Sequence, residues 1–193
     1  TRKESSAASD VYKRQDLYGG YKTEVAGVGV DVGAIAYNYP GSKSGSLSGG
    51  DYFANTQEAY VGLTYGPATF KTSYVLGKNY FASSGGKDAS GTLYYDLSIA
   101  QEIAPKLTAS AHAGLTDYKL DYQSNVDSKK FSYADYNIGL TYDYEGFLLS
   151  AKYYFNDAKA GTKYYAAAND AAYGNGKANL YKNTLVFSVL KAF

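Results

Sequence analysis

The stretch Tyr133–Glu145, YADYNIGLTYDYE, decides the fold of this chain. One set of alternate positions is apolar: Ala134, Tyr136, Ile138, Leu140, Tyr142 and Tyr144. The other set is polar or small: Asp135, Asn137, Gly139, Thr141, Asp143 and Glu145. Side chains alternate across a strand, so the stretch predicts a β-ribbon with one apolar and one polar face. Its length suits the roughly 9–11 residues with which a tilted strand crosses a bilayer.

The same alternation recurs along the chain and predicts nine strands, near residues 16–25, 28–39, 56–66, 68–78, 91–103, 106–117, 131–144, 146–157 and 181–193. Short turns are predicted at Ala26–Gly27, Gly66–Pro67, Ala104–Pro105 and Glu145–Gly146. Long loops are predicted near Pro40–Thr56, Lys78–Gly91, Asp117–Lys130 and Asp157–Leu180. Short turns at one end and long loops at the other are typical of a bacterial outer-membrane barrel.

The predicted fold class is therefore all-β: an antiparallel, up-and-down transmembrane β-barrel in the bacterial outer membrane. A soluble β-sandwich also alternates and is the competing interpretation. Tyrosine supplies 24 of the 193 residues and gathers near strand ends, which favours an interfacial aromatic girdle. Charged residues in mid-strand favour a wet interior over a sandwich core.

Composition excludes several other classes of protein. The net charge of +1 gives no electrostatic footprint for nucleic acid. The mean hydropathy is −0.37, and no apolar run approaches the roughly 20 residues of a transmembrane helix. There is no cysteine, so disulfides and thiolate-bound metals are excluded. We expect no cofactor and no resident metal.

The first 15 residues differ from the rest, because they are polar and do not alternate. Residues 10–15, DVYKRQ, resemble the translation of a sequencing-adapter end, which predicts that residues 1–15 are a non-native, disordered leader. The barrel domain is then 16–193. Bacterial barrels have even strand numbers and periplasmic termini, so the nine strands are expected to belong to a barrel of ten or twelve, with a signal peptide and N-terminal strands missing.

The closing segment predicts an assembly signal. Phe187, Val189 and the terminal Phe193 share one face of the last strand. This arrangement resembles the C-terminal signature that the barrel-assembly machinery reads in outer-membrane proteins. Lys191 departs from that pattern, but near the membrane edge a lysine amine reaches water easily.

Several segments resemble the TorF porin family: Asp16–Lys22, Asp31–Gly41, Glu58–Tyr65, Phe70–Phe81 and Leu185–Phe193. These are strand and turn patterns without chemistry. The resemblance implies an outer-membrane β-barrel with a cleaved signal peptide and roughly three more N-terminal strands. We therefore expect a porin-like channel for passive diffusion of small solutes, with outer-membrane lipids and the barrel-assembly machinery as partners.

The candidate pore-lining residues are the charged positions on the predicted polar faces, together with the single histidine: Asp31, Glu58, Lys71, Asp96, Lys106, His112, Asp135, Asp143 and Lys152. Charges around a wet lumen set the ionic preference of a channel. Opposed acids and bases that pair across the lumen and plug it are the competing interpretation. The signs are mixed, so no preference for anions or cations is predicted.

Two alternative functions stay open. A non-conducting structural or adhesive barrel would act through its long loops, and it is favoured if Tyr60, Tyr94 and Tyr154 block the passage. A barrel lipid hydrolase would use Ser110 and His112, which share a face two residues apart. The order Ser-x-His, the lumenal placement and the lack of an orienting third residue speak against it, and we expect no enzyme.

Overall fold

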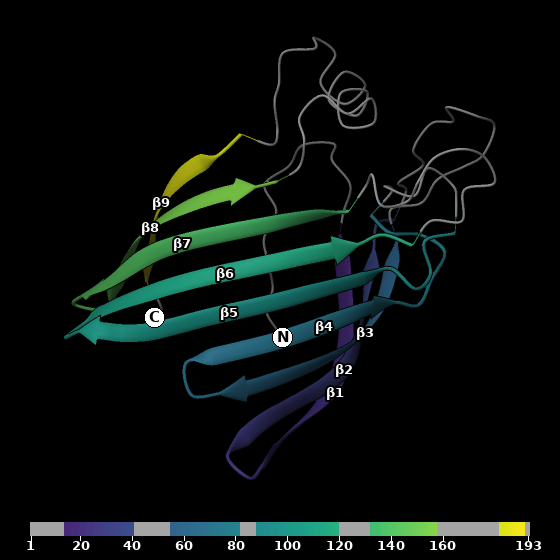
Figure 1. Cartoon of the computed structure of the whole chain (residues 1–193), viewed down its shortest axis with the longest axis horizontal. Helices are drawn as coiled ribbons and strands as arrows, with labels where there is room; N and C mark the ends of the chain where they lie inside the picture. The colour runs from purple at the N-terminus through teal and green to yellow at the C-terminus, as the bar shows by residue number, and fades with distance from the viewer. Residues whose placement is uncertain (1–13, 41–54, 82–87, 120–131, 158–181, 192–193) are drawn as a thin grey trace.

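The computed structural model describes residues 14–40, 55–81, 88–119, 132–157 and 182–191. Nine strands form one sheet in which every strand pairs antiparallel with its neighbours in chain order (Figure 1). The strands are β1 Gln15–Val25, β2 Val28–Asn38, β3 Thr56–Tyr65, β4 Ala68–Val75, β5 Leu93–Ala104, β6 Leu107–Asp117, β7 Tyr133–Tyr144, β8 Phe147–Asn156 and β9 Thr184–Lys191. This confirms the predicted all-β, up-and-down arrangement.

Tight turns join the strands at one end of the sheet. In two of these turns, both turn residues adopt the positive φ that a two-residue hairpin needs. Ala26 and Gly27 have φ of 52° and 79°, and Glu145 and Gly146 have φ of 50° and 82°. Two successive positive φ values match the twist of the flanking strands. At the other end the connections include residues 41–54, 82–87, 120–131 and 158–181, so most of the predicted long loops lie outside the described residues.

One turn differs from the prediction. The β5–β6 turn is formed by Pro105 and Lys106, one residue later than expected. Proline fixes φ at about −65°, so it cannot take the positive φ, and Lys106 takes it instead with φ of 66°. The extra residue appears as a register shift between Glu102 and Ala104 in the pairing of β5 with β6.

Cross-strand register sorts the residues into two faces. One row of partners is apolar and runs Val30, Leu63, Phe70, Leu97, Ala113, Tyr136, Phe155. The adjacent row is polar or small and runs Lys22, Asp31, Gly62, Lys71, Asp96, Gly114, Asp135, Asn156. We call the face with Leu97 the outer face and the face with Asp96 the inner face. Within the described strands, the outer face carries Asp, Glu, Lys, Arg or His only at Asp117 and Lys191, both at strand ends.

The sheet has no second layer among the described residues. Large apolar side chains of the outer face are exposed, for example Ile138 at 55%, Leu140 at 48% and Leu97 at 44%. The buried hydrophobic residues in the described ranges are only Val75, Tyr80, Ala89 and Ala134, and the first three form a small cluster at the loop end. Strand pairing, and not a layered hydrophobic core, therefore holds the described residues together.

Figure 1 shows that the sheet is strongly curved, and β1 and β9 are its two edge strands. Among the described residues no pairing joins β1 to β9, so the described strands form one curved sheet with two edges. No helix that is long and apolar enough to cross a membrane occurs among the described residues.

Candidate functional site on the inner face

The residues predicted to line a lumen mostly share the inner face. Asp31, Lys71, Asp96 and Asp135 lie in one cross-strand row, with Gly62 and Gly114 between them. Small residues between charged ones leave room for the long side chains to lie along the wall. The sequence pattern predicted the face correctly, but it did not predict which charges would meet.

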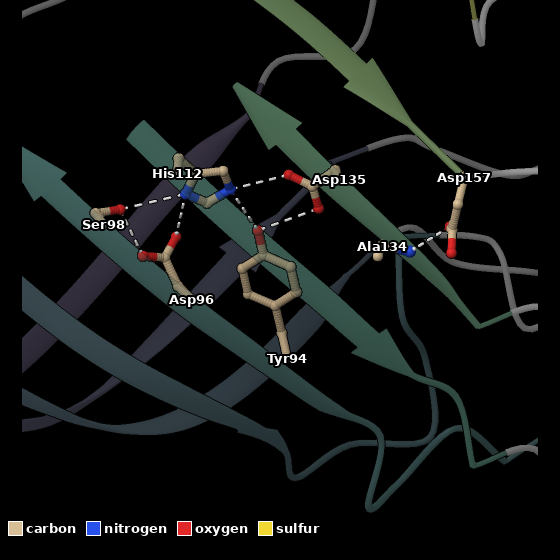
Figure 2. Close-up of polar contacts among 7 residues, drawn as sticks. All are labelled: Tyr94, Asp96, Ser98, His112, Ala134, Asp135 and Asp157. Carbon is tan, nitrogen blue, oxygen red and sulfur yellow. Dashed lines mark hydrogen bonds and ion pairs between the residues drawn. The ribbon is translucent and has the colours of Figure 1, made fainter. Parts of the chain in front are cut away.

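His112 joins two of these carboxylates (Figure 2). Its Nδ1 lies 3.1 Å from Asp96 Oδ2, and its Nε2 lies 3.0 Å from Asp135 Oδ1. The three residues come from neighbouring strands: Asp96 from β5, His112 from β6 and Asp135 from β7. The imidazole side chain is only 16% exposed, while the carboxylates are 25% and 35% exposed. The cluster thus links the three strands β5, β6 and β7 on the inner face.

The chemistry of this cluster follows from its acceptors. Carboxylate oxygens only accept hydrogen bonds, so both His112 contacts are hydrogen bonds only when both ring nitrogens carry protons. In that state one positive ring lies between two negative groups, and both bonds are charge-assisted. Ser98 Oγ donates to Asp96 Oδ1 at 2.8 Å and lies 3.2 Å from His112 Nδ1. Tyr94 Oη donates to Asp135 Oδ2 at 3.3 Å.

The Ser110–His112 pair of the hydrolase alternative does not meet. Ser110 Oγ faces the Gly139 carbonyl oxygen at 3.5 Å, and the serine beside the imidazole is Ser98 on β5. A Ser98–His112–Asp135 constellation superficially suggests nucleophilic catalysis. The Ser98 hydroxyl, however, donates its proton to Asp96 Oδ1 at 2.8 Å, and Asp96 and Asp135 occupy both ring nitrogens, so the imidazole is not placed to take the serine proton.

A second polar network lies toward β1. Lys22 Nζ pairs with Asp31 Oδ2 at 3.1 Å, and Tyr60 Oη donates to Asp31 Oδ1 at 3.3 Å. Lys71 Nζ lies 4.2 Å from the centre of the Tyr60 ring, which is a cation–π distance. Lys71 is therefore held by an aromatic face, although its cross-strand partner is Asp96.

Glu58 is the exception on this wall. The residue is 7% exposed, yet no hydrogen bond or ion pair reaches its carboxylate among the described residues. It lines a hollow of about 580 Å³ at the loop end of the inner face. The sequence placed Glu58 on the polar face of its strand. It did not predict that Glu58 would lack an ion pair, because that depends on Lys71 lying over the Tyr60 ring.

Two tyrosines of the inner face lie along the wall. A Cβ placed on Gly33 would collide with Tyr60 Oη, and a Cβ on Gly114 would collide with Tyr94 Oη. Glycine at these two positions therefore makes space for the phenol rings. The Tyr60 and Tyr94 rings therefore lie along the sheet, over the neighbouring strands.

The comparison with known proteins identifies the family of this chain. A family described as bacterial protein of unknown function (Gcw_chp) matches residues 3–193. The chain belongs to the Gcw_chp family. No curated protein and no solved structure matches it. The family description names no function, so the TorF resemblance of this Gcw_chp protein stays a prediction.

Three predicted pore residues of the Gcw_chp protein lie elsewhere on the wall. Lys106 was expected at the start of a strand but lies in the β5–β6 turn, where its N–H donates to Glu102 Oε1 at 3.0 Å. Asp143 is close to the β7–β8 turn, and its Oδ1 accepts the Gly146 N–H at 2.9 Å. Lys152 lies on the inner face and lines a smaller hollow of about 290 Å³ with His112.

The predicted assembly signal lies only partly in the described chain. Phe187 and Val189 are on the outer face of β9, 74% and 68% exposed, whereas Phe193 lies outside the described residues. Lys191 Nζ lies 3.9 Å from the centre of the Phe147 ring, so this lysine packs at the turn end of the outer face. Among the described residues of the Gcw_chp protein, no group of three His, Cys, Asp or Glu side chains is placed to hold a metal ion.

Proposed function

We propose that this chain forms part of the wall of an outer-membrane β-barrel and that the complete barrel is a porin-like channel for passive diffusion of small solutes. The observation that carries the proposal is the unlayered sheet with opposite faces. Apolar side chains such as Ile138 and Leu140 are about half exposed, at 55% and 48%. Exposed apolar surface on this scale calls for a covering, and acyl chains of a bilayer supply it on one face only.

The inner face supports the same proposal. It holds Lys22, Asp31, Lys71, Asp96, His112 and Asp135 in mid-wall, where hydrocarbon would penalise each charge. Water in a lumen removes that penalty. Across the middle of the described wall, acidic and basic groups are close to balanced, which favours weak discrimination between small anions and cations.

The tyrosines bear on whether the lumen is open. Tyr60 and Tyr94 lie over glycines of the adjacent strands, which keeps their rings near the wall. This placement favours a passage over a plug. The structural or adhesive alternative depends on the long loops, most of which lie outside the described residues, and no observation here favours it.

Single-channel conductance tests the proposal. The full-length protein is refolded in detergent, its β-content is checked by circular dichroism, and it is added to planar bilayers. We expect discrete, ohmic conductance steps with permeability for cations and anions that differs by only a few-fold. Folded protein that inserts into the bilayer but gives no steps would contradict the channel, while leaving the membrane barrel intact.

Enzyme activity is tested separately, since the wall also carries His112. A purified His112→Ala variant and the unsubstituted protein are compared on phospholipid and short-chain ester substrates. We expect no hydrolysis by either protein above the rate without protein. A hydrolytic rate that disappears with the histidine would instead favour the barrel hydrolase.

A further inference from the structure

The hollow at the loop end of the inner face has the chemistry of a binding site. Its volume is about 580 Å³, well above the space that one inorganic ion occupies. Its wall carries the ionisable residues Glu58, Lys71, Asp96 and Asp135. The aromatic residues that line it are Tyr37, Tyr80, Phe81, Tyr94, Tyr118 and Tyr133. Acidic groups outnumber basic ones, and rings make up half of the lining residues.

Within this hollow, the charge of Lys71 acts on Glu58 without forming an ion pair with it. Asp96 and Asp135 are both occupied by His112, whereas the Glu58 carboxylate has no hydrogen bond or ion pair among the described residues, at 7% exposure. The nearest base on the neighbouring strand, Lys71, lies over the Tyr60 ring. The Glu58 oxygens are not among the fully buried atoms without a partner, so they face the hollow, and a donor bound there would replace the solvent at this carboxylate.

The aromatic side chains lie where they can help such a group. The Phe81 ring is 5.1 Å from the Tyr37 ring and 5.0 Å from the Tyr80 ring, and Tyr80 is 5.4 Å from Tyr118. Burial raises the pKa of the Tyr80 phenol, and the nearby Tyr118 and the Glu58 carboxylate raise it further. The Tyr80 ring therefore stays neutral in water and keeps an electron-rich face that attracts cations. The Tyr37 ring already has a cation over it, because the Arg14 guanidinium carbon lies 5.1 Å from its centre.

We propose that this hollow binds an organic ammonium cation, with Glu58 as the counter-charge and the ring cluster Tyr37, Tyr80 and Phe81 as the apolar enclosure. A methylated ammonium group has a diffuse positive charge and an apolar skin, so it is matched both by the carboxylate and by aromatic faces. A bare metal ion fits poorly, since no group of metal-ligating side chains occurs among the described residues. The site does not require a conducting channel.

Equilibrium binding to the full-length protein in detergent micelles tests the site. Choline is titrated by calorimetry, and 3,3-dimethylbutan-1-ol, which has the same shape without the charge, is titrated in parallel. We expect choline to bind at least about tenfold more tightly than its uncharged isostere. Glu58→Gln should weaken choline binding by about tenfold or more, and Phe81→Leu should weaken it by several-fold.

Glu24→Gln is the matched control, because Glu24 is an exposed carboxylate on β1 at the turn end of the same sheet. It should leave choline binding unchanged, and circular dichroism should show all three variants folded. Equal binding of choline and the alcohol would overturn the proposal and point to a neutral ligand. Absence of choline binding, or unchanged binding in both Glu58→Gln and Phe81→Leu, would overturn it as well. Conductance plays no part in these measurements, so this site and the channel stand or fall separately.

Discussion

A lysine on the outer face of β7 should destabilise this protein far more than a lysine on the inner face of the same strand. Ile138 lies near the middle of β7, with Ala111 and Tyr153 as its cross-strand partners, and is 55% exposed. In a bilayer, Ile138→Lys places a charge near the midplane, and the expected loss in free energy of unfolding is about 2–4 kcal/mol.

The control is Thr141→Lys. Thr141 lies on the inner face between two uncharged partners, Thr108 and Ser150. A lysine there meets water, so the expected change is within about 0.5 kcal/mol. The contrast between the two variants isolates the environment of each face, because the strand and the introduced residue are the same.

The assay is reversible urea unfolding of the full-length protein from phospholipid vesicles, followed by tyrosine fluorescence. The reasoning is refuted if Ile138→Lys loses no more stability than Thr141→Lys. A side chain that is 55% exposed to water tolerates lysine with little change, so that result would mean the outer face meets water and not lipid.

Three further outcomes follow from the inner wall and the edges. Gly114→Ala should destabilise by about 1–3 kcal/mol in vesicle unfolding, because its Cβ collides with Tyr94 Oη, and adding Tyr94→Phe should recover part of the loss. His112→Ala should lose about 2 kcal/mol by leaving Asp96 and Asp135 without their shared donor, and Asp135→Asn in the same background should add less than it does alone. The 193-residue chain by itself, in which β1 and β9 are unpaired edges of the described sheet, should show no heat-modifiable migration on a gel; a folded, faster-migrating band would contradict this.

Strand identity was predictable from sequence, because period-two alternation is itself the property that puts residues on opposite faces. YADYNIGLTYDYE became β7 with its apolar positions on one face, and eight further segments followed the same rule. The inner-face placement of Asp96, His112 and Asp135 was predictable for the same reason. Closure of the barrel and its membrane were inferred from this pattern and stay predictions.

Partnerships across strands were not predictable, because alternation fixes the face of a residue and not its neighbour. A two-residue turn at Ala104–Pro105 would place Leu97 opposite His112. The turn at Pro105–Lys106 and the bulge beside it place Ser98 there instead. That one-residue slip decides which serine touches the imidazole, and it follows from the fixed φ of a proline.

The alternation of residues between the two faces of the sheet has a practical consequence for engineering. Changes confined to even-numbered positions of β6, such as Ser110, His112 and Gly114, alter the inner surface, while Ala109, Ala111 and Ala113 between them keep the outer one. A combinatorial library restricted to the first set would diversify the inner surface and leave the outer surface of the sheet unchanged.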